Sequence, residues 1–221
     1  MRTNFSRHTH CNHPVLPSLS SLPSFSKLRE HELQNFDDIG TWASSEKSLS
    51  NVTHIFWCLG TTRAQAGSAE AFKKIDYEYA MSFAKAAKTA ADGKPHFLLL
   101  SATNADANSW FLYPQTKGKL ENDIGALGFS KYSIFHPGLL LTDTGERPIS
   151  RLAESLAIKM APMMEWMAPG KLAIKCSAVG KAMVKTAFSP SEVNGTPFKG
   201  APGTTYSNKE MVNMITNVTP K

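Results

Sequence analysis

The sequence predicts an α/β fold built around a parallel β-sheet. Two short apolar runs, Val52–Leu59 and Phe97–Leu100, have the length and the polar or Gly/Pro boundaries of buried strands. Between them, Ser68–Ala91 carries apolar residues at helical spacing. The alternation of buried strands with an amphipathic helix is typical of a parallel sheet covered by helices.

The N-terminal segment differs in composition from the rest of the chain. Residues 1–26 are rich in Ser, Pro, His and Arg, and no acidic residue precedes Glu30. This composition allows a mitochondrial presequence, but Pro14, Pro17 and Pro23 break any long amphipathic helix. We expect a disordered or degenerate segment over 1–26, followed by a single domain over 27–221.

The elements before the second strand follow from local signals. Lys27–Phe36 has a weak strand pattern, and Gly60 ends the Val52–Leu59 strand. Ser68 is a suitable N-cap for the helix that follows, in which Phe72, Ile75, Tyr79, Phe83 and Ala86 share a face. Asp92-Gly93 closes this helix.

The most informative stretch is Lys94–Lys117. Ser101 follows the buried strand Phe97–Leu100, at the edge where ligands bind in open α/β sheets. Tyr113 and Lys117 are four residues apart and therefore share one helix face. A neighbouring ammonium favours the phenolate and lowers the pKa of a tyrosine, which suits proton exchange with a carbonyl or alcohol oxygen. A half-buried tyrosine beside a solvated lysine is the alternative.

The remaining elements are predicted with less detail. Pro114 is tolerated only in a first helical turn, which places Tyr113 at the helix start. The further predictions are a helix to Leu127 ended by Gly128, a strand over Lys131–Leu141, a helix near Ser150–Lys159 with a Met-rich segment after it, a short strand over Leu172–Cys176, a helix over Ala178–Phe188 capped by Ser177, an edge strand over Thr204–Tyr206 and a final helix to about Asn217.

Composition excludes several classes. The net charge of +6 comes from scattered lysines without a nucleic-acid motif, so we expect no nucleic-acid partner. No run approaches the roughly 20 apolar residues of a membrane span. Cys11, Cys58 and Cys176 lack metal-ligand spacing, so we expect no metal site, and their odd number indicates a reducing compartment.

The flanking motifs resemble one family in order along the chain. The motifs are Cys58-Leu-Gly-Thr-Thr-Arg63, Ala66-Gly67, Phe72, Asp76-Tyr77, His96–Ser101, Phe111-Leu-Tyr113, Lys117-Gly118, Leu127–Phe129 and Pro137–Leu141. They resemble the Tat-interacting-protein-type oxidoreductases, an atypical branch of the short-chain dehydrogenases/reductases with fungal relatives on mitochondria. The resemblance covers roughly Lys27 to Ser189.

The resemblance implies a Rossmann-like, doubly wound parallel sheet with a small C-terminal substrate-side region. It implies an NAD(P)(H)-dependent oxidoreductase acting on a carbonyl or alcohol, with Tyr113 as proton donor or acceptor assisted by Lys117 and Ser101. NADP(H) is favoured over NAD(H). The implied cofactor-binding residues are Asn35, Phe36, Leu59, Gly60, Thr61, Tyr113, Lys117, Pro137 and Gly138.

Two departures from the family pattern leave an alternative open. The first glycine is Gly40, so no Gly-rich phosphate loop precedes the fold and we expect an N-terminally truncated sheet. His136 stands where the family has arginine. The alternative is a non-catalytic regulatory or protein-interaction protein on the same fold, with a protein partner. We expect a cytoplasmic protein without a transmembrane segment, with the mitochondrial outer-membrane surface as the alternative location.

Overall fold

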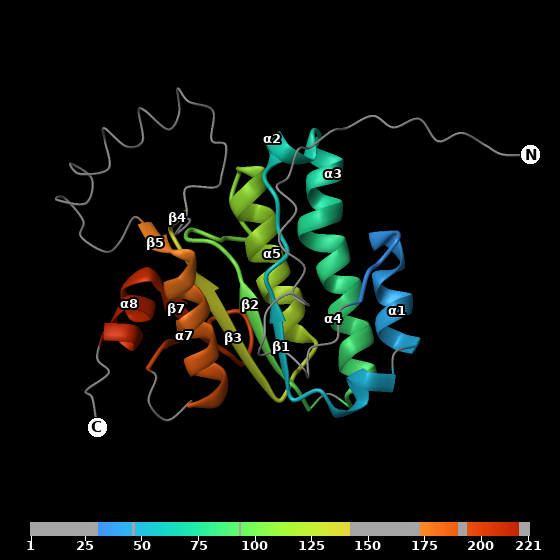
Figure 1. Ribbon diagram of the computed structural model, residues 1–221. Coiled ribbons are helices and arrows are strands. Elements are labelled where there is room, and N and C mark those ends of the chain that lie inside the picture. Colours follow the sequence, from blue (N-terminus) through green and yellow to red (C-terminus); the bar gives the residue numbers. More distant parts are fainter. Residues whose placement is uncertain (1–30, 46, 93, 142–172, 190–193, 217–221) are drawn as a thin grey trace, which may run out of the picture. The chain divides into compact units, whose positions relative to one another are not determined.

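The computed structural model describes residues 31–45, 47–92, 94–141, 173–189 and 194–216 (Figure 1). The packing divides the chain between Gln34 and Asn35, and the fold below is that of the unit Asn35–Lys221. The predictions for 1–26 and for the helix near Ser150–Lys159 with its Met-rich segment lie outside the described residues.

The secondary structure alternates between strands and helices. The elements are the 3₁₀ turn η2 (Phe36–Asp38), α1 (Ile39–Ser45), the 3₁₀ turn η3 (Lys47–Asn51), β1 (His54–Trp57), α2 (Arg63–Ala66), α3 (Ala69–Lys73), the π-helical turn η4 (Lys74–Glu78), α4 (Tyr79–Ala90), β2 (His96–Leu100), α5 (Leu112–Ala126), β3 (Lys131–His136), β4 (Leu139–Leu141), β5 (Ala173–Lys175), α7 (Cys176–Phe188), β6 (Thr196–Pro197), β7 (Thr204–Ser207) and α8 (Asn208–Thr216).

The main sheet has five strands in the order β1-β2-β3-β7-β6. The first four are parallel, and β6 pairs antiparallel with β7. The predicted α/β class with a mainly parallel sheet is therefore confirmed. The expectation that Thr204–Tyr206 forms an edge strand is wrong, because β7 has β3 on one side and β6 on the other. The predicted strand Lys131–Leu141 is split, and β4 pairs with β5 in a separate sheet.

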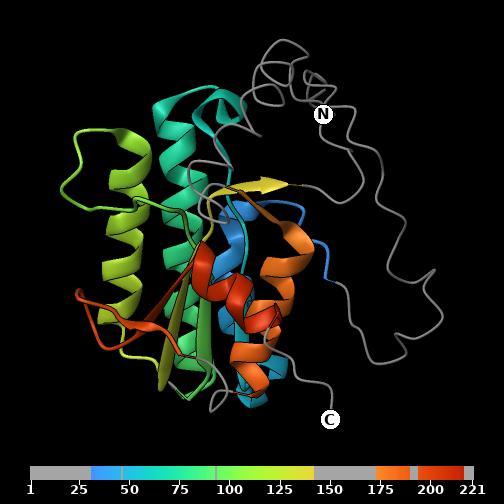
Figure 2. The ribbon, with the colours of Figure 1, turned by 90° about the vertical axis from the view of Figure 1, so that its left-hand side faces the viewer.

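Helices cover both faces of the main sheet. Figure 2 shows α4 and α5 on one face and α7 and α8 on the other. Strand β2 lies between β1 and β3, and its first four residues are buried, as predicted for Phe97–Leu100. On the α7 side, Leu98 and Phe135 pack with Val179, Met183 and Met211. Burial on both faces explains why the β2 sequence reads as one continuous apolar run.

The long helix after β1 contains an irregular turn. Ser68 caps α3 through its Oγ, which accepts from the Ala71 N–H at 3.0 Å, as predicted. The chain then passes through η4 into α4 with helical backbone angles at the junctions. The π turn adds residues to one turn, so the buried stripe runs through Phe72, Asp76 and Ala80. The predicted face with Ile75 and Tyr79 is only partly buried.

Two further predictions need correction. Within the described part of Lys27–Phe36 there is no strand: residues 31–35 are irregular, and Phe36 begins η2. Asn35 caps this turn, because its Oδ1 accepts from the Asp37 N–H at 3.0 Å. Ser177 does not cap α7, because the helix begins at Cys176 and Lys175 occupies the N-cap position. Among the described helices, none combines the length and the apolarity that crossing a bilayer demands.

Candidate functional site

The candidate site lies at the carboxyl ends of β1, β2 and β3. Gly60 and Thr61 follow β1, Ser101 follows β2 directly, and His136 is the last residue of β3. The Ser101 N–H donates to the Phe135 carbonyl at 2.9 Å, which extends the β2–β3 pairing past the end of β2. The sheet therefore fixes where the Ser101 side chain begins.

Helix α5 brings three functional side chains to this edge. Tyr113, Lys117 and Glu121 are four residues apart and form one stripe along the helix. Pro114 is the third residue of α5, so it lies in the first turn as predicted, and Tyr113 stands near the helix start. The Lys117 Nζ lies 5.9 Å from the centre of the Tyr113 ring. The predicted pairing of Tyr113 with Lys117 on one helix face is thus present.

Lys117 is buried and ion-paired. Its Nζ lies 2.6 Å from Asp76 Oδ1, and the two side chains are 6% and 0% exposed. Asp76 Oδ2 accepts from the Thr61 N–H at 2.7 Å. A Cβ on Gly60 would stand 3.2 Å from both Lys117 Nζ and Asp76 Oδ1, so the glycine leaves room for the pair. Asp76 belongs to one of the family-like motifs, but the sequence predicted no role for it.

The electrostatics at Tyr113 differ from the expectation. Burial and the negative charge of Asp76 raise the pKa of Tyr113. The expectation that the pKa of Tyr113 is lowered is therefore wrong, because burial of the phenol and the nearby Asp76 carboxylate both favour its neutral form. The Tyr113 ring packs against Phe72 with centroids 5.7 Å apart, and the residue is 41% exposed. Tyr113 is thus a neutral phenol at neutral pH.

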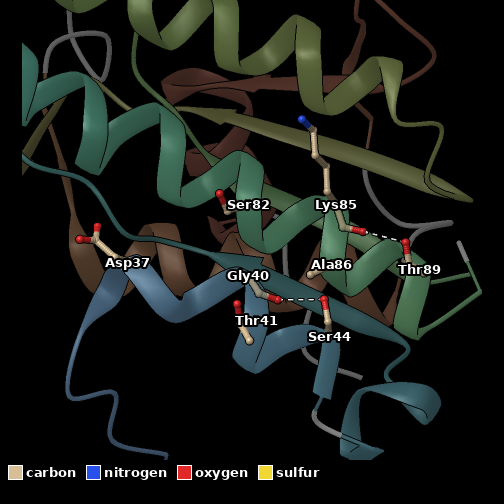
Figure 3. Close-up of a pocket in the computed structure, with 8 residues that line it drawn as sticks. All are labelled: Asp37, Gly40, Thr41, Ser44, Ser82, Lys85, Ala86 and Thr89. Atoms are coloured by element: carbon tan, nitrogen blue, oxygen red, sulfur yellow. Dashed lines mark hydrogen bonds between the residues drawn. The ribbon is translucent and has the colours of Figure 1, made fainter.

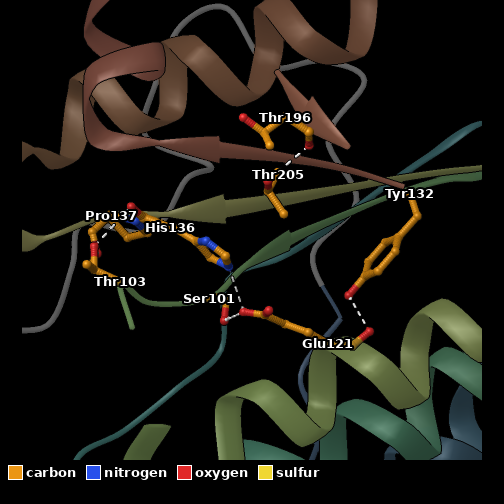
Figure 4. A network of polar contacts seen from close by, with 8 residues as sticks. All are labelled: Ser101, Thr103, Glu121, Tyr132, His136, Pro137, Thr196 and Thr205. Atoms are coloured by element: carbon orange, nitrogen blue, oxygen red, sulfur yellow. Dashed lines mark hydrogen bonds and ion pairs between the residues drawn. The ribbon is translucent and has the colours of Figure 1, made fainter. Parts of the chain in front are cut away.

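A second cluster forms around Glu121 (Figure 4). Glu121 Oε1 accepts from the Ser101 hydroxyl and lies 2.8 Å from His136 Nε2. The Glu121 side chain is 3% exposed and that of His136 24%. Among the described residues, no hydrogen bond joins Ser101 to Tyr113. The Glu121 carboxylate, for which the sequence predicted no role, therefore accepts the hydrogen bond of the Ser101 hydroxyl and ties β2 and β3 to α5.

The Pro137-Gly138 turn is held from two sides. Thr103 donates to the Pro137 carbonyl from its N–H at 3.0 Å and from its hydroxyl at 2.8 Å. On the other side, the Gly138 N–H donates to Asn208 Oδ1 at 2.9 Å. Asn208 Nδ2 is buried and has no partner among the described residues. A free amide donor therefore stands beside this turn.

Asn35 and Phe36 belong to a different neighbourhood. Asn35 caps η2, and Phe36 packs on the Tyr79 ring with centroids 5.8 Å apart. Asp37 Oδ1 lies 2.7 Å from Lys74 Nζ and accepts from the Tyr79 hydroxyl at 2.9 Å. None of the described hydrogen bonds or ring contacts joins Asn35 or Phe36 to Gly60 or Lys117. Leu59 is half-buried between β1 and Gly60.

A polar groove between α1 and α4 lies apart from this chemistry (Figure 3). It is lined by Asp37, Gly40, Thr41, Ser44, Ser82, Lys85, Ala86 and Thr89. None of the predicted site residues lines it. The two helices approach closely because Gly40 has no side chain, and a Cβ there would stand 3.3 Å from the Ser82 Cβ. Within the described ranges, no group of three or more His, Cys, Asp and Glu residues could hold a metal ion.

Curated relatives identify the family. The protein FMP52, mitochondrial, of Candida albicans is 39% identical over 194 residues, which cover 82% of this chain and 80% of that protein. This chain belongs to the FMP52 family. FMP52-2 of Scheffersomyces stipitis is 44% identical over 138 residues, covering 62% of this chain and 58% of the relative. No protein-family model matches the chain.

The FMP52 assignment agrees with the resemblance drawn from the motifs. Rat HTATIP2 is 41% identical over 135 residues, covering 61% of this chain and 53% of that protein. Apart from the Candida protein, the matches to these relatives span little more than half of their length. The FMP52 relatives are named mitochondrial proteins, so the expectation of a cytoplasmic protein is wrong.

One solved structure supports the fold of this FMP52-family protein. The crystal structure of gox2181 matches with a TM-score of 0.51 at 11% identity, covering 77% of this chain and 71% of that chain. A dTDP-4-dehydrorhamnose reductase from Bacillus anthracis in complex with NADP matches with a TM-score of 0.49 at 11% identity, covering 78% of this chain and 60% of that chain. The fold is Rossmann-like, with a mainly parallel central sheet covered by helices.

Proposed function

We propose that this protein is an NAD(P)(H)-dependent oxidoreductase of the short-chain type that acts on a carbonyl or alcohol. The observation that carries the proposal is the α5 stripe: a partly exposed phenol and a buried ammonium one turn apart, beside the end of the strand that carries Ser101. The order of the family motifs supports the same chemistry. The names of the FMP52 relatives support a mitochondrial location.

Each side chain has a defined task in this proposal. The neutral Tyr113 phenol donates a proton to a carbonyl oxygen, or its phenolate accepts one from an alcohol. The Ser101 hydroxyl donates its hydrogen bond to Glu121, so the lone pairs of the Ser101 oxygen are left to accept a hydrogen bond from a substrate alcohol. For a carbonyl substrate, the Ser101 hydroxyl must turn away from Glu121 and donate to the substrate oxygen. Lys117 supplies a fixed positive charge one helical turn from Tyr113.

A nicotinamide cofactor supplies or accepts the hydride in such an enzyme. The residues present fit its ribose and nicotinamide end. Lys117 is a buried cation that can bond a ribose hydroxyl, Gly60 leaves the space above it open, and the unpartnered Asn208 amide lies beside the Pro137-Gly138 turn. The fit concerns this end of the cofactor only, since residues 1–39 contain no glycine. We propose NADP(H) in preference to NAD(H), as the family resemblance implies.

Titration with NADPH and NADH, followed by cofactor fluorescence or calorimetry, tests the cofactor. We expect micromolar binding of NADPH, weakened about 10-fold or more by Lys117→Met, because a hydrogen bond to a charged group contributes roughly 1.5–3 kcal/mol. Lys119→Met is the matched control: Lys119 is exposed on the same helix, lies over the Tyr77 ring, and should leave binding unchanged.

Turnover tests the chemistry separately from binding. Tyr113→Phe should retain NADPH binding and abolish NADPH oxidation with a panel of aromatic aldehydes and ketones. Absence of NADPH and NADH binding at millimolar concentration would reject the enzyme proposal. It would favour the regulatory or protein-interaction alternative, in which the fold is kept without the cofactor.

A further inference from the structure

Asp76 is an acidic residue on an otherwise apolar stripe. It is 1% exposed, and its helical neighbours Phe72 and Ala80, four residues away on either side, are fully buried. A charge at such a position is costly unless it is paired and hydrogen-bonded. The π-helical turn η4 presents this carboxylate, and π turns inside α-helices are frequent at functional sites.

The carboxylate of Asp76 joins two parts of the candidate site. One oxygen lies 2.6 Å from Lys117 Nζ on α5, and the other accepts the Thr61 N–H at 2.7 Å after β1. The Oδ1 atom has no hydrogen bond of regular geometry among the described residues, so its contact with the ammonium is chiefly electrostatic. Gly60 lines the same spot, where a Cβ would press on both charged atoms.

We propose that Asp76 is the positioning residue of this site: its buried carboxylate fixes the Lys117 ammonium against the Gly60-Thr61 turn and so decides where that ammonium stands relative to Tyr113. The inference deepens the proposed function and rests on it. Without Asp76, nothing else in the described contacts of Lys117 opposes its charge, and the ammonium is free to move toward the Tyr113 ring 5.9 Å away.

The position of the ammonium has a consequence for proton transfer. Burial and the Asp76 charge both raise the pKa of Tyr113, whereas a free ammonium would lower it. Burial and the Asp76 charge together therefore favour the protonated form of Tyr113. A second aspartate–tyrosine contact provides an internal comparison: Tyr77 donates to Asp123 Oδ2 at 2.5 Å, and burial together with Asp123 raises the pKa of Tyr77 to about 12.

The test is an NMR titration of tyrosine ring carbons in the full chain between pH 7 and 11. Asp76→Asn keeps the shape and an acceptor for the Thr61 N–H but removes the charge. We expect the Tyr113 midpoint to fall by about one pH unit and the Tyr77 signal to stay in place. Asp123→Asn is the matched control and should move Tyr77 instead. An unchanged Tyr113 midpoint in folded Asp76→Asn would overturn the proposal.

A second measurement covers the case in which Asp76→Asn folds but is too unstable for a titration to high pH. Thermal unfolding of Asp76→Asn, Lys117→Met and the double variant forms a mutant cycle. Because each single change leaves one buried charge unpaired, the double variant should melt closer to wild type than either single variant. Additive losses would contradict the proposed positioning. Neither measurement needs a cofactor. Absence of NADPH binding would therefore reject the enzyme proposal without deciding whether Asp76 positions Lys117, and the two proposals can fail separately.

Discussion

Gly118 offers the sharpest prediction about how the site loop is held. The loop from Ser101 to α5 crosses directly over this glycine: a Cβ on Gly118 would lie 2.3 Å from the Ala107 nitrogen and 2.4 Å from the Asp106 carbonyl carbon. Both atoms belong to the backbone, so neither can swing away as a flexible side chain would. The Asp106 N–H also donates to the Pro114 carbonyl at 3.0 Å, which anchors the loop to the first turn of α5.

Replacing Gly118 by alanine therefore sets two effects against each other. Alanine favours the helix over glycine by about 0.5–1 kcal/mol. Overpacking a tight contact costs about 1–3 kcal/mol or more. Because the contact is with backbone, we expect the clash to dominate. Subtracting the helix gain leaves a net loss of up to about 2.5 kcal/mol. For a protein of this length, 1 kcal/mol corresponds to roughly 2–4 °C, so the melting temperature of Gly118→Ala should fall by up to roughly 10 °C.

Gly180 is the matched control, because it lies in the exposed part of α7 and has no atom within 4 Å of an added Cβ. Gly180→Ala should gain only the helix preference and raise the melting temperature by roughly 1–4 °C. Circular dichroism melts of the two variants under identical conditions make the comparison. If Gly118→Ala melted at or above the wild-type temperature, the close crossing of the loop over α5 would be refuted.

Three other outcomes follow from the buried polar groups. Burial lowers the pKa of His96 to about 4, so the folded state binds a proton at His96 less readily than the unfolded chain does. The free energy of unfolding should therefore fall by at most about 3 kcal/mol as the pH drops from about 6.5 to about 4. In urea unfolding, His96→Asn should lose less stability over the same pH range. Glu121→Gln should lower the free energy of unfolding by about 1–3 kcal/mol. The double variant with Ser101→Ala should lose less than the sum of the two single losses in the same assay. Strictly additive losses would contradict the shared hydrogen bond. Gly60→Ala should cost about 1 kcal/mol or more in thermal unfolding because its Cβ presses on the Lys117 ammonium, and a neutral or stabilising result would refute this crowding.

Local features of the fold could be predicted from the sequence because they depend on neighbours along the chain. The apolar run Phe97–Leu100 became the buried centre of β2, and Ser68 became an N-cap. The four-residue spacing placed Tyr113 and Lys117 on one face of α5. The same spacing extends to Glu121, and an aspartate four residues after Phe72 interrupts an apolar stripe. These two sequence signals could have pointed to Glu121 and Asp76 as site residues.

Long-range partners could not be predicted in this way. Hydrophobic periodicity does not say which acidic residue a lysine meets, and the partner of Lys117 is Asp76 from the separate turn η4. For the same reason the pKa of Tyr113 moves opposite to the expectation from Lys117 alone, since burial of the phenol in the fold and the Asp76 charge both raise it.

The sequence by itself determined the class of fold, the strand end that carries Ser101 and the pairing of Tyr113 with Lys117, because strand burial and helix spacing are written in short stretches of chain. Only the tertiary structure decided that the Ser101 hydroxyl donates a hydrogen bond to Glu121 and that Lys117 is held by Asp76. Electrostatic contacts of buried groups depend on which elements pack together, and that packing is a property of the whole fold.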